Sequence, residues 1–163
     1  MKTISKETAK DFLLRHIRNG FKVNERVMRE VEAEGTCFLL KLADKDSFLS
    51  LIWQVCDSET WLTPAMADRT LRSVAARLIK ANQKYLELSS WFHRCDKIDR
   101  EFDFGKFGWL VVTPALDSER QHSPHGIFYL YDGNHKAIVL ARRLLSGAAY
   151  EPVEALCLVP RRN

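Results

Sequence analysis

The chain has 163 residues, of which 46% are hydrophobic and 28% charged, and its formal net charge is +4 at pH 7. This length and composition are typical of one globular domain with a core of its own, and they argue against a disordered chain. No apolar run approaches the length of about 20 residues that a membrane-spanning helix needs, and the polar amino terminus lacks the apolar centre of a signal peptide. We therefore expect a single cytoplasmic domain over residues 1–163, without membrane contact.

The cysteines and the charge say little about activity. The four cysteines lie far apart and form no Cys-x-x-Cys pair, so the sequence predicts neither a zinc site nor a redox pair. The modest positive charge permits a nucleic-acid partner, but no dense basic run indicates one. Walker-type and Rossmann glycine motifs do not occur in the sequence. Any function therefore has to be inferred from individual segments.

The amino-terminal part of the chain is predicted to be helical. Apolar residues recur at helical spacing over residues 5–19 and again over residues 24–34. A glycine follows each of these segments, which is a common stop signal for a helix. We expect residues 1–35 to be a helical extension and residues 36–163 to form the core of the domain.

The next part combines one clear strand with two helical patterns. Residues 36–42 form a nearly continuous apolar run, which is typical of a strand with both faces covered. Residues 44–57 are expected to be a short helix, although a strand over residues 48–55 fits the same short run. A longer helix is predicted from Pro64, after the capping hydroxyl of Thr63, to about residue 89.

This longer predicted helix carries basic side chains over residues 69–84. A solvated helix face is the ordinary explanation of such a pattern. A contact with nucleic acid is the alternative explanation. The tryptophans and phenylalanines on either side of this helix are expected to lie in the core.

The segment that follows is less regular. Residues 91–108 are rich in charge and are expected to be irregular, with phenylalanines that hold the segment on the core. A strand is predicted over residues 107–113, followed by a polar loop over residues 115–126. Loops held by rigid strands often carry function, although an exposed hairpin loop explains the same polarity. If the flanking strands are neighbours, we expect this loop to lie near the polar turn over residues 132–136. Its secondary site candidates are Glu119, Arg120, His122 and His125.

A strand, a polar turn and a helix follow one another near the carboxyl end. The predicted strand over residues 127–131 leads into the turn Asp132-Gly133-Asn134-His135-Lys136. Apolar residues after the turn recur at helical spacing, and Gly147 marks the end of that helix. A last strand is expected over residues 153–159. The fold class is therefore α+β or α/β, with a small mixed sheet flanked by helices.

The turn over residues 132–136 has the properties of an anion site. A helix start exposes unpaired N–H groups and carries a partial positive charge. Gly133 permits a backbone conformation that side chains forbid and lets a ligand approach closely, while His135 and Lys136 add donors. The same residues are also good turn formers without any ligand, with Asp132 or Asn134 as the helix cap.

The turn also resembles a known motif. Residues 132–136, the alanine-rich helix after them, Gly147 and the strand over residues 153–159 resemble the Asp-Gly-x-His-Arg segment of the ParB/sulfiredoxin superfamily. That superfamily includes sulfiredoxins, free serine kinases, the amino-terminal domains of ParB partition proteins and the "DGQHR" proteins. Lys136 stands where arginine is usual, which keeps the charge but loses the bidentate fork. Asn134 stands where sulfiredoxins have their reactive cysteine, so sulfinic-acid reduction is not implied.

The resemblance, which covers roughly the last third of the chain, implies a function. In the sulfiredoxins and kinases the matching turn and helix start hold nucleotide phosphates. This chain is accordingly expected to be a nucleotide-binding domain of a bacterial or phage protein, with a phosphotransferase or NTPase activity that uses Mg²⁺ and ATP or CTP. The implied phosphate ligands are Gly133, Asn134, His135 and Lys136. Asp132 would be a magnesium ligand or general base, and His135 and Glu119 are the other catalytic candidates.

A second hypothesis from a different class accompanies the first. The chain would then be a non-catalytic DNA- or protein-binding module of a partition, phage or mobile-element system, in which the fold persists without catalysis. The modest positive charge and the basic residues over 69–84 permit this interpretation. Strongly salt-dependent retention on DNA would favour it, because protein contacts to phosphates release counterions.

Overall fold

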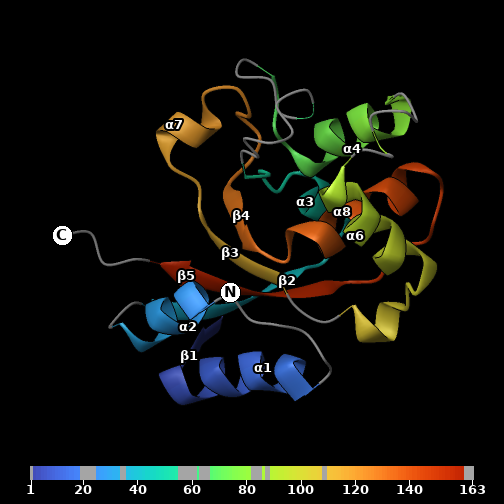
Figure 1. The fold of residues 1–163 in the computed structure, drawn as a ribbon. Helices are drawn as coiled ribbons and strands as arrows, with labels where there is room; N and C mark the ends of the chain where they lie inside the picture. Colours follow the sequence, from blue (N-terminus) through green and yellow to red (C-terminus); the bar gives the residue numbers. More distant parts are fainter. Residues whose placement is uncertain are drawn as a thin grey trace.

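The fold is taken from a computed structural model of the chain, and the residues described are 2–18, 25–33, 36–54, 62, 67–81, 86, 89–107 and 110–159. These residues build one five-stranded sheet with helices on both faces (Figure 1). The structure therefore confirms the expected α+β class with a small mixed sheet. Within the described part of the chain, no helix is long and apolar enough to cross a membrane.

The sheet has the strand order β1-β2-β5-β3-β4. The neighbours β5 and β3 are parallel, and every other neighbouring pair is antiparallel. The long strands β2 and β5 pair along their whole length, which gives the sheet a stable centre. The strands are β1 (Lys2–Ile4), β2 (Thr36–Leu42), β3 (Leu110–Pro114), β4 (Phe128–Asp132) and β5 (Val153–Val159).

Helices cover both faces of the sheet. On one face lie α1 (Lys6–Arg18) and α2 (Glu25–Glu32) (Figure 1). The helices on the other face are α3 (Lys45–Leu49), α4 (Leu71–Lys80), α6 (Ser90–Arg100) and α8 (Asn134–Leu145). Two short elements complete the described chain, the 3₁₀ turn η2 (Phe104–Lys106) and the single-turn helix α7 (Asp117–Arg120).

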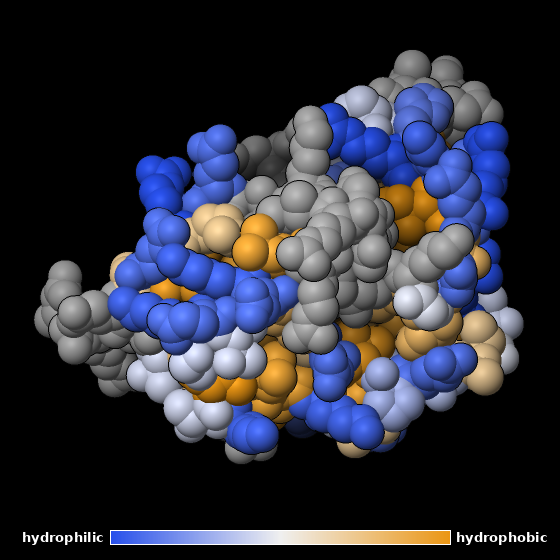
Figure 2. Space-filling model, turned by 90° about the horizontal axis from the view of Figure 1, so that it is seen from below, coloured by the Kyte–Doolittle hydropathy of each residue, from blue (hydrophilic) through white to orange (hydrophobic). Residues whose placement is uncertain are grey.

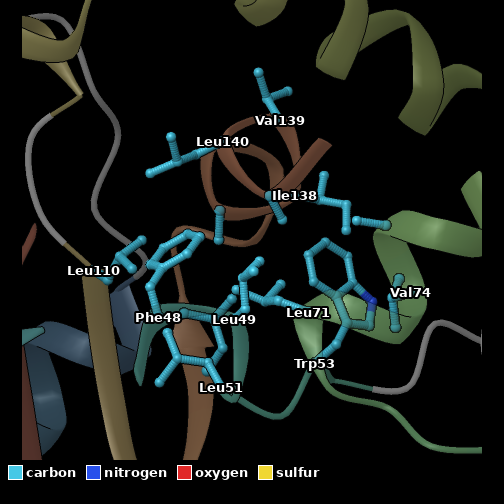
Figure 3. Close-up of a cluster of buried hydrophobic side chains, with 14 of the residues drawn as sticks. Phe48, Leu49, Leu51, Trp53, Leu71, Val74, Leu110, Ile138, Val139 and Leu140 are labelled. Carbon is cyan, nitrogen blue, oxygen red and sulfur yellow. The ribbon is translucent and has the colours of Figure 1, made fainter. Parts of the chain in front are cut away.

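The strands divide the core into two clusters because successive side chains point to opposite faces of a sheet. In β5, Ala155 and Cys157 belong to the large cluster under α8, whereas Leu156 and Leu158 belong to the cluster under α1 and α2. Figure 3 shows part of the large cluster around α8. Figure 2 views the molecule from the side of α1 and α2, where apolar surface remains visible between polar side chains.

Residues after α3 extend the sheet beyond β4. The N–H group of Ile52 donates to the carbonyl of Phe128 at 2.9 Å, and the carbonyl of Ile52 accepts from Leu130 N–H at 2.8 Å. On its other side Ile52 forms a bridge with Thr70, just before α4. These bonds hold the apolar segment after α3 against the edge of the sheet and fix where α4 begins.

Several sequence-based predictions are confirmed. The strands over residues 36–42 and 153–159 have the predicted bounds, and the strand over residues 127–131 appears as β4, shifted by one residue. The helix after the turn is α8, and Gly147 follows it with a left-handed φ of 98°. These segments share long apolar runs or clear stop signals, which are the most informative local patterns.

The predictions for the middle of the chain are partly wrong. The predicted helix over residues 64–89 is α4, which begins only at Leu71, while Thr63 and Pro64 lie outside the described residues. Its cap is Thr70, whose side chain accepts a hydrogen bond from Ser73 N–H. Asp68 supports this start, because its carboxylate accepts from Thr70 and Ser73.

Other segments also differ from the prediction. Residues 91–108, expected to be irregular, contain the helix α6, and the loop over 115–126 contains α7. Within the described residues up to 54, the helix expected over 44–57 is limited to the five residues of α3, because Ile52 then pairs with β4. Residues 1–35, expected to be an extension, contribute the edge strand β1 and two helices that pack on the sheet.

We predict that Gly126→Ala destabilises the protein. A Cβ atom at this position would collide with Cγ1 of Ile52 and lie 3.1 Å from the carbonyl oxygen of Ser50. Overpacking of this kind costs about 1–3 kcal/mol in the free energy of unfolding, which denaturant titration measures. Gly105→Ala is the control, because the nearest atom to an added Cβ is a carboxylate oxygen of Asp103 at 3.3 Å, a much smaller overlap than at Gly126. Equal stability of the two variants would contradict the close packing of Gly126 on Ile52.

Candidate functional site

The turn between β4 and α8 depends on one glycine. Gly133 is the N-cap of α8 and has a left-handed backbone, with φ 89° and ψ 16°. Residues with a side chain rarely adopt this backbone conformation, so glycine suits the position. The alternative in which Asp132 or Asn134 caps the helix does not hold, since the N-cap residue is Gly133 and no side-chain cap bond is present. Asp132 instead accepts a hydrogen bond from Gly133 N–H at 2.7 Å.

The start of α8 presents backbone donors. The bond from Ala137 N–H to the carbonyl of Gly133, at 2.9 Å, closes the first turn of the helix. The N–H groups of Asn134 and His135 precede this bond and have no acceptor within the helix. The twelve residues of α8 also place the positive end of its dipole here. The local geometry is therefore that of a helix start able to bind an anion.

Two buried side-chain atoms at this helix start lack partners. Asn134 Oδ1 and His135 Nε2 are buried and form no hydrogen bond within the described part of the structure. Most buried polar atoms in proteins are hydrogen-bonded, so each exception needs an explanation. These two atoms belong to consecutive residues, and the N–H groups of the same residues have no acceptor within the helix. This arrangement is expected where a polar ligand binds.

His135 lies against an aromatic pair. Its ring centroid is 5.7 Å from that of Trp91, with 32° between the ring planes, and Trp91 in turn meets Trp53 edge-on at 5.6 Å. Burial lowers the pKa of His135, the positive charge of Arg94 lowers it further, and Asp132 partly opposes both effects. The imidazole is therefore neutral at pH 7, which is the form that can accept a proton from a substrate hydroxyl.

The parallel course of α6 and α8 brings Trp91 and Arg94 to this site. Trp91 contacts His135 near the two helix starts, and Asp99 bonds Arg143 at 2.6 Å near the two helix ends. The starts of α6 and α8 therefore lie at the same level. Sequence reasoning missed these neighbours because residues 91–108 were expected to be irregular. The available signal was the helical spacing of the apolar residues after Ser89, the cap of α6.

Lys136 has a structural role that the sequence did not indicate. Its Nζ donates to the carbonyl of Phe107 at 3.1 Å and lies 5.7 Å from the centre of the Phe107 ring. The side chain is only 9% exposed, and burial lowers its pKa to about 8, opposed by the charge of Asp132. We therefore assign this side chain to the packing of α8 on the segment before β3, and no longer to phosphate binding.

Glu119 does not lie near the turn. Its carboxylate accepts a hydrogen bond from Leu116 N–H at 2.7 Å and so caps the short helix α7. The pairing of β3 with β4 runs from Pro114 and Phe128 at one end to Val111 and Asp132 at the other.

The loop over residues 115–126 is therefore at the far end of this hairpin from residues 132–136, and the expectation that the two are close is wrong. The same position separates Glu119, Arg120, His122 and His125 from the start of α8.

A magnesium ion at Asp132 would have to be held in part by a ligand. The described residues contain no group of three or more His, Cys, Asp or Glu that could hold a metal ion. Magnesium, however, is commonly held by one or two carboxylates together with substrate phosphates and water. A single carboxylate beside a helix start that can bind an anion fits that mode of binding, and it does not fit a metal held by the protein alone.

The basic residues over 69–84 are partly committed to contacts within the protein. Arg72 forms an ion pair with Asp46, and Arg77 donates to the carbonyls of Leu62 and Asp68 at 2.7 and 2.9 Å. These contacts connect α4 to its surroundings. The DNA-binding hypothesis stays a prediction.

Comparison with known proteins does not assign the chain. No family model, curated protein or solved structure matches it. The similarity of residues 132–136 to the ParB/sulfiredoxin motif therefore stays a prediction. The motif gives a reason to test nucleotides first as ligands of this helix start.

We predict that Lys136→Met removes a pH dependence of stability. The pKa of Lys136 is about 8 in the folded protein, against an ordinary value of 10.5. Between these values the unfolded chain binds more protons at this position, so the wild type should gain stability as the pH rises. Relative to Lys136→Met, the gain should approach about 3 kcal/mol in the free energy of unfolding. Chemical denaturation from pH 7 to 10.5 measures it, and parallel pH profiles would contradict the burial of this charge.

Proposed function

We propose that the start of α8 binds the phosphate groups of a nucleotide. The observation that carries this proposal is the pair of buried, unpartnered atoms, Asn134 Oδ1 and His135 Nε2, beside a helix start without a side-chain cap. Phosphates are suitable ligands because they accept several hydrogen bonds at once and carry negative charge toward the helix dipole. The resemblance of residues 132–136 to a phosphate-binding motif supports the same ligand class.

Each group at the site has a defined role in this proposal. The N–H groups of Asn134 and His135 donate to phosphate oxygens, and Gly133 keeps the approach open because it has no side chain. If the side-chain amide of Asn134 rotates by half a turn, its nitrogen takes the place of Oδ1 and can donate to a phosphate oxygen. His135 can donate from Nε2 in the corresponding tautomer. Arg94, whose charge acts on His135, adds a cation beside the helix start.

The proposed activity is transfer or hydrolysis of a terminal phosphoryl group of ATP or CTP. Such reactions depend mainly on the positioning of phosphates and on charge neutralisation. Asp132 would hold a magnesium ion together with the phosphates, and the ion would neutralise charge that develops during transfer. In its other tautomer, with Nε2 unprotonated, His135 would instead take the proton of the attacking hydroxyl or water at that atom. Glu119 has no part in this arrangement, because it lies at the far end of the β3–β4 hairpin.

We predict that Gly133→Ala abolishes nucleotide binding while Gly147→Ala preserves it. Both glycines have left-handed φ angles, 89° and 98°, so alanine costs a similar strain of about 1–2 kcal/mol at either position. Only Gly133 lies at the phosphate site, where a methyl group would obstruct the ligand. Gly147 follows the same helix at its other end, with no atom within 4 Å of an added Cβ.

The test is a thermal-shift and calorimetric comparison of ATP, CTP, GTP and ADP with Mg²⁺. At a nucleotide concentration one hundred times the dissociation constant, binding should stabilise the wild type by about 2.7 kcal/mol. His135→Gln should weaken binding by about tenfold or more, and the exposed His93→Gln on α6 serves as its control. The absence of a shift with every nucleotide would overturn the proposal, and strongly salt-dependent retention on DNA would then support the binding-module hypothesis.

A further inference from the structure

A cavity of about 450 Å³ lies away from the start of α8, along the second half of that helix. It forms because α4 and α6 each pack extensively on α8 but make little contact with one another. The volume falls within the range of small-molecule sites, which is roughly 300–1,000 Å³. Its apolar lining includes Leu78, Ile79, Leu86 and Phe92, and its polar lining includes Arg142 and Arg143.

One side of this cavity is apolar and partly open to solvent. Leu78 and Leu86 are buried, and they continue the core toward the cavity. Ile79 is 49% exposed and is among the few large hydrophobic residues of the described chain with that much exposed surface. An exposed isoleucine at the wall of a cavity gains stabilisation when an apolar group covers it.

Among the residues that the structure describes, the polar side carries one positive charge without an acidic partner. Arg143 is engaged, since it donates to the carboxylate and to the carbonyl of Asp99, both at 2.6 Å, and stacks on Phe102 at 4.5 Å. Arg142 lies over the ring of Phe92 at 5.6 Å and has no ion pair among the described residues. The cavity therefore combines an apolar wall with a guanidinium that Phe92 holds in place.

We propose that this cavity binds a small apolar carboxylate. The carboxylate would pair with the planar fork of Arg142, and the apolar body would cover Ile79 and Phe92. A phosphate dianion is a poorer match, because the second guanidinium, that of Arg143, is already neutralised by Asp99. This site is independent of the proposed phosphate site, since it uses residues near the end of α8 and needs no nucleotide.

The test uses 3-phenylpropanoate as the probe and its uncharged amide as the matched ligand. Titration followed by two-dimensional NMR of the full chain, without nucleotide, should shift amide signals of Ile79, Phe92 and Arg142 in a saturable manner. The amide should bind about tenfold more weakly, since it lacks the charge-assisted pair. This comparison is made on the wild type, so it does not depend on the folding of any variant.

Variants then locate the contact. Arg142→Gln should weaken 3-phenylpropanoate about tenfold, and Ile79→Ser should weaken it through the lost apolar contact. Arg100→Gln, at the exposed end of α6, should leave the affinity unchanged. The proposal is overturned if no saturable shift occurs up to about 10 mM probe. A dissociation constant above that concentration would be weaker than ordinary small-ligand binding. It is equally overturned if the wild type binds the amide as tightly as 3-phenylpropanoate. The same holds if Arg142→Gln binds 3-phenylpropanoate as tightly as the wild type does.

Discussion

The burial of α8 determines where both proposed sites lie. Its residues from Ala137 to Ala141 are buried on every side, between the sheet, α4 and α6 (Figure 3). Burial of each large apolar side chain contributes about 1.5–3 kcal/mol relative to its exposure, so this helix is held firmly in position. A helix fixed along its centre has fixed ends. The start of α8, where we propose the phosphate site, and the cavity near its other end are therefore both preorganised.

The helix α6 complements both ends of α8. Because the two helices run parallel, Trp91 lies beside His135 at one end, where the charge of Arg94 also lowers the pKa of His135, while Asp99 neutralises Arg143 at the other end. The positive ends of two helix dipoles thus lie at the same level, although α6 is already capped by Ser89. The uncapped start of α8 is the one that retains donors for a ligand.

The sequence predicted those elements whose signals are local. Strands β2 and β5 were predicted with their bounds, because a run of apolar residues between turn signals determines a strand directly. The turn around Gly133 and the helix after it were predicted for the same reason. Helix α6 was missed because its charged residues conceal a short apolar stripe. The start of α4 was predicted too early because Thr63-Pro64 is a strong sequence signal for a helix start, whereas Thr70 is the cap of α4.

The environment of the site was beyond sequence reasoning because it depends on contacts between distant segments. Arg94 lowers the pKa of His135 only because α6 packs beside α8. Lys136 donates to the carbonyl of Phe107 only because its side chain is buried in the core. The prediction that Glu119 lies near residues 132–136 assumed that the loop between β3 and β4 is close to the turn after β4. The loop and that turn instead lie at opposite ends of the β3–β4 hairpin. The cavity beside Arg142 likewise exists only in the packing of three helices.

The most direct test of the central claim is an NMR titration of the ¹⁵N-labelled protein with ATP or CTP and Mg²⁺. We expect the largest amide shifts at Gly133, Asn134 and His135, together with a change in the imidazole nitrogen signals of His135, and little change at residues 142–146. Shifts confined to another part of the chain, or no saturable shift with either nucleotide, would contradict a phosphate site at the start of α8.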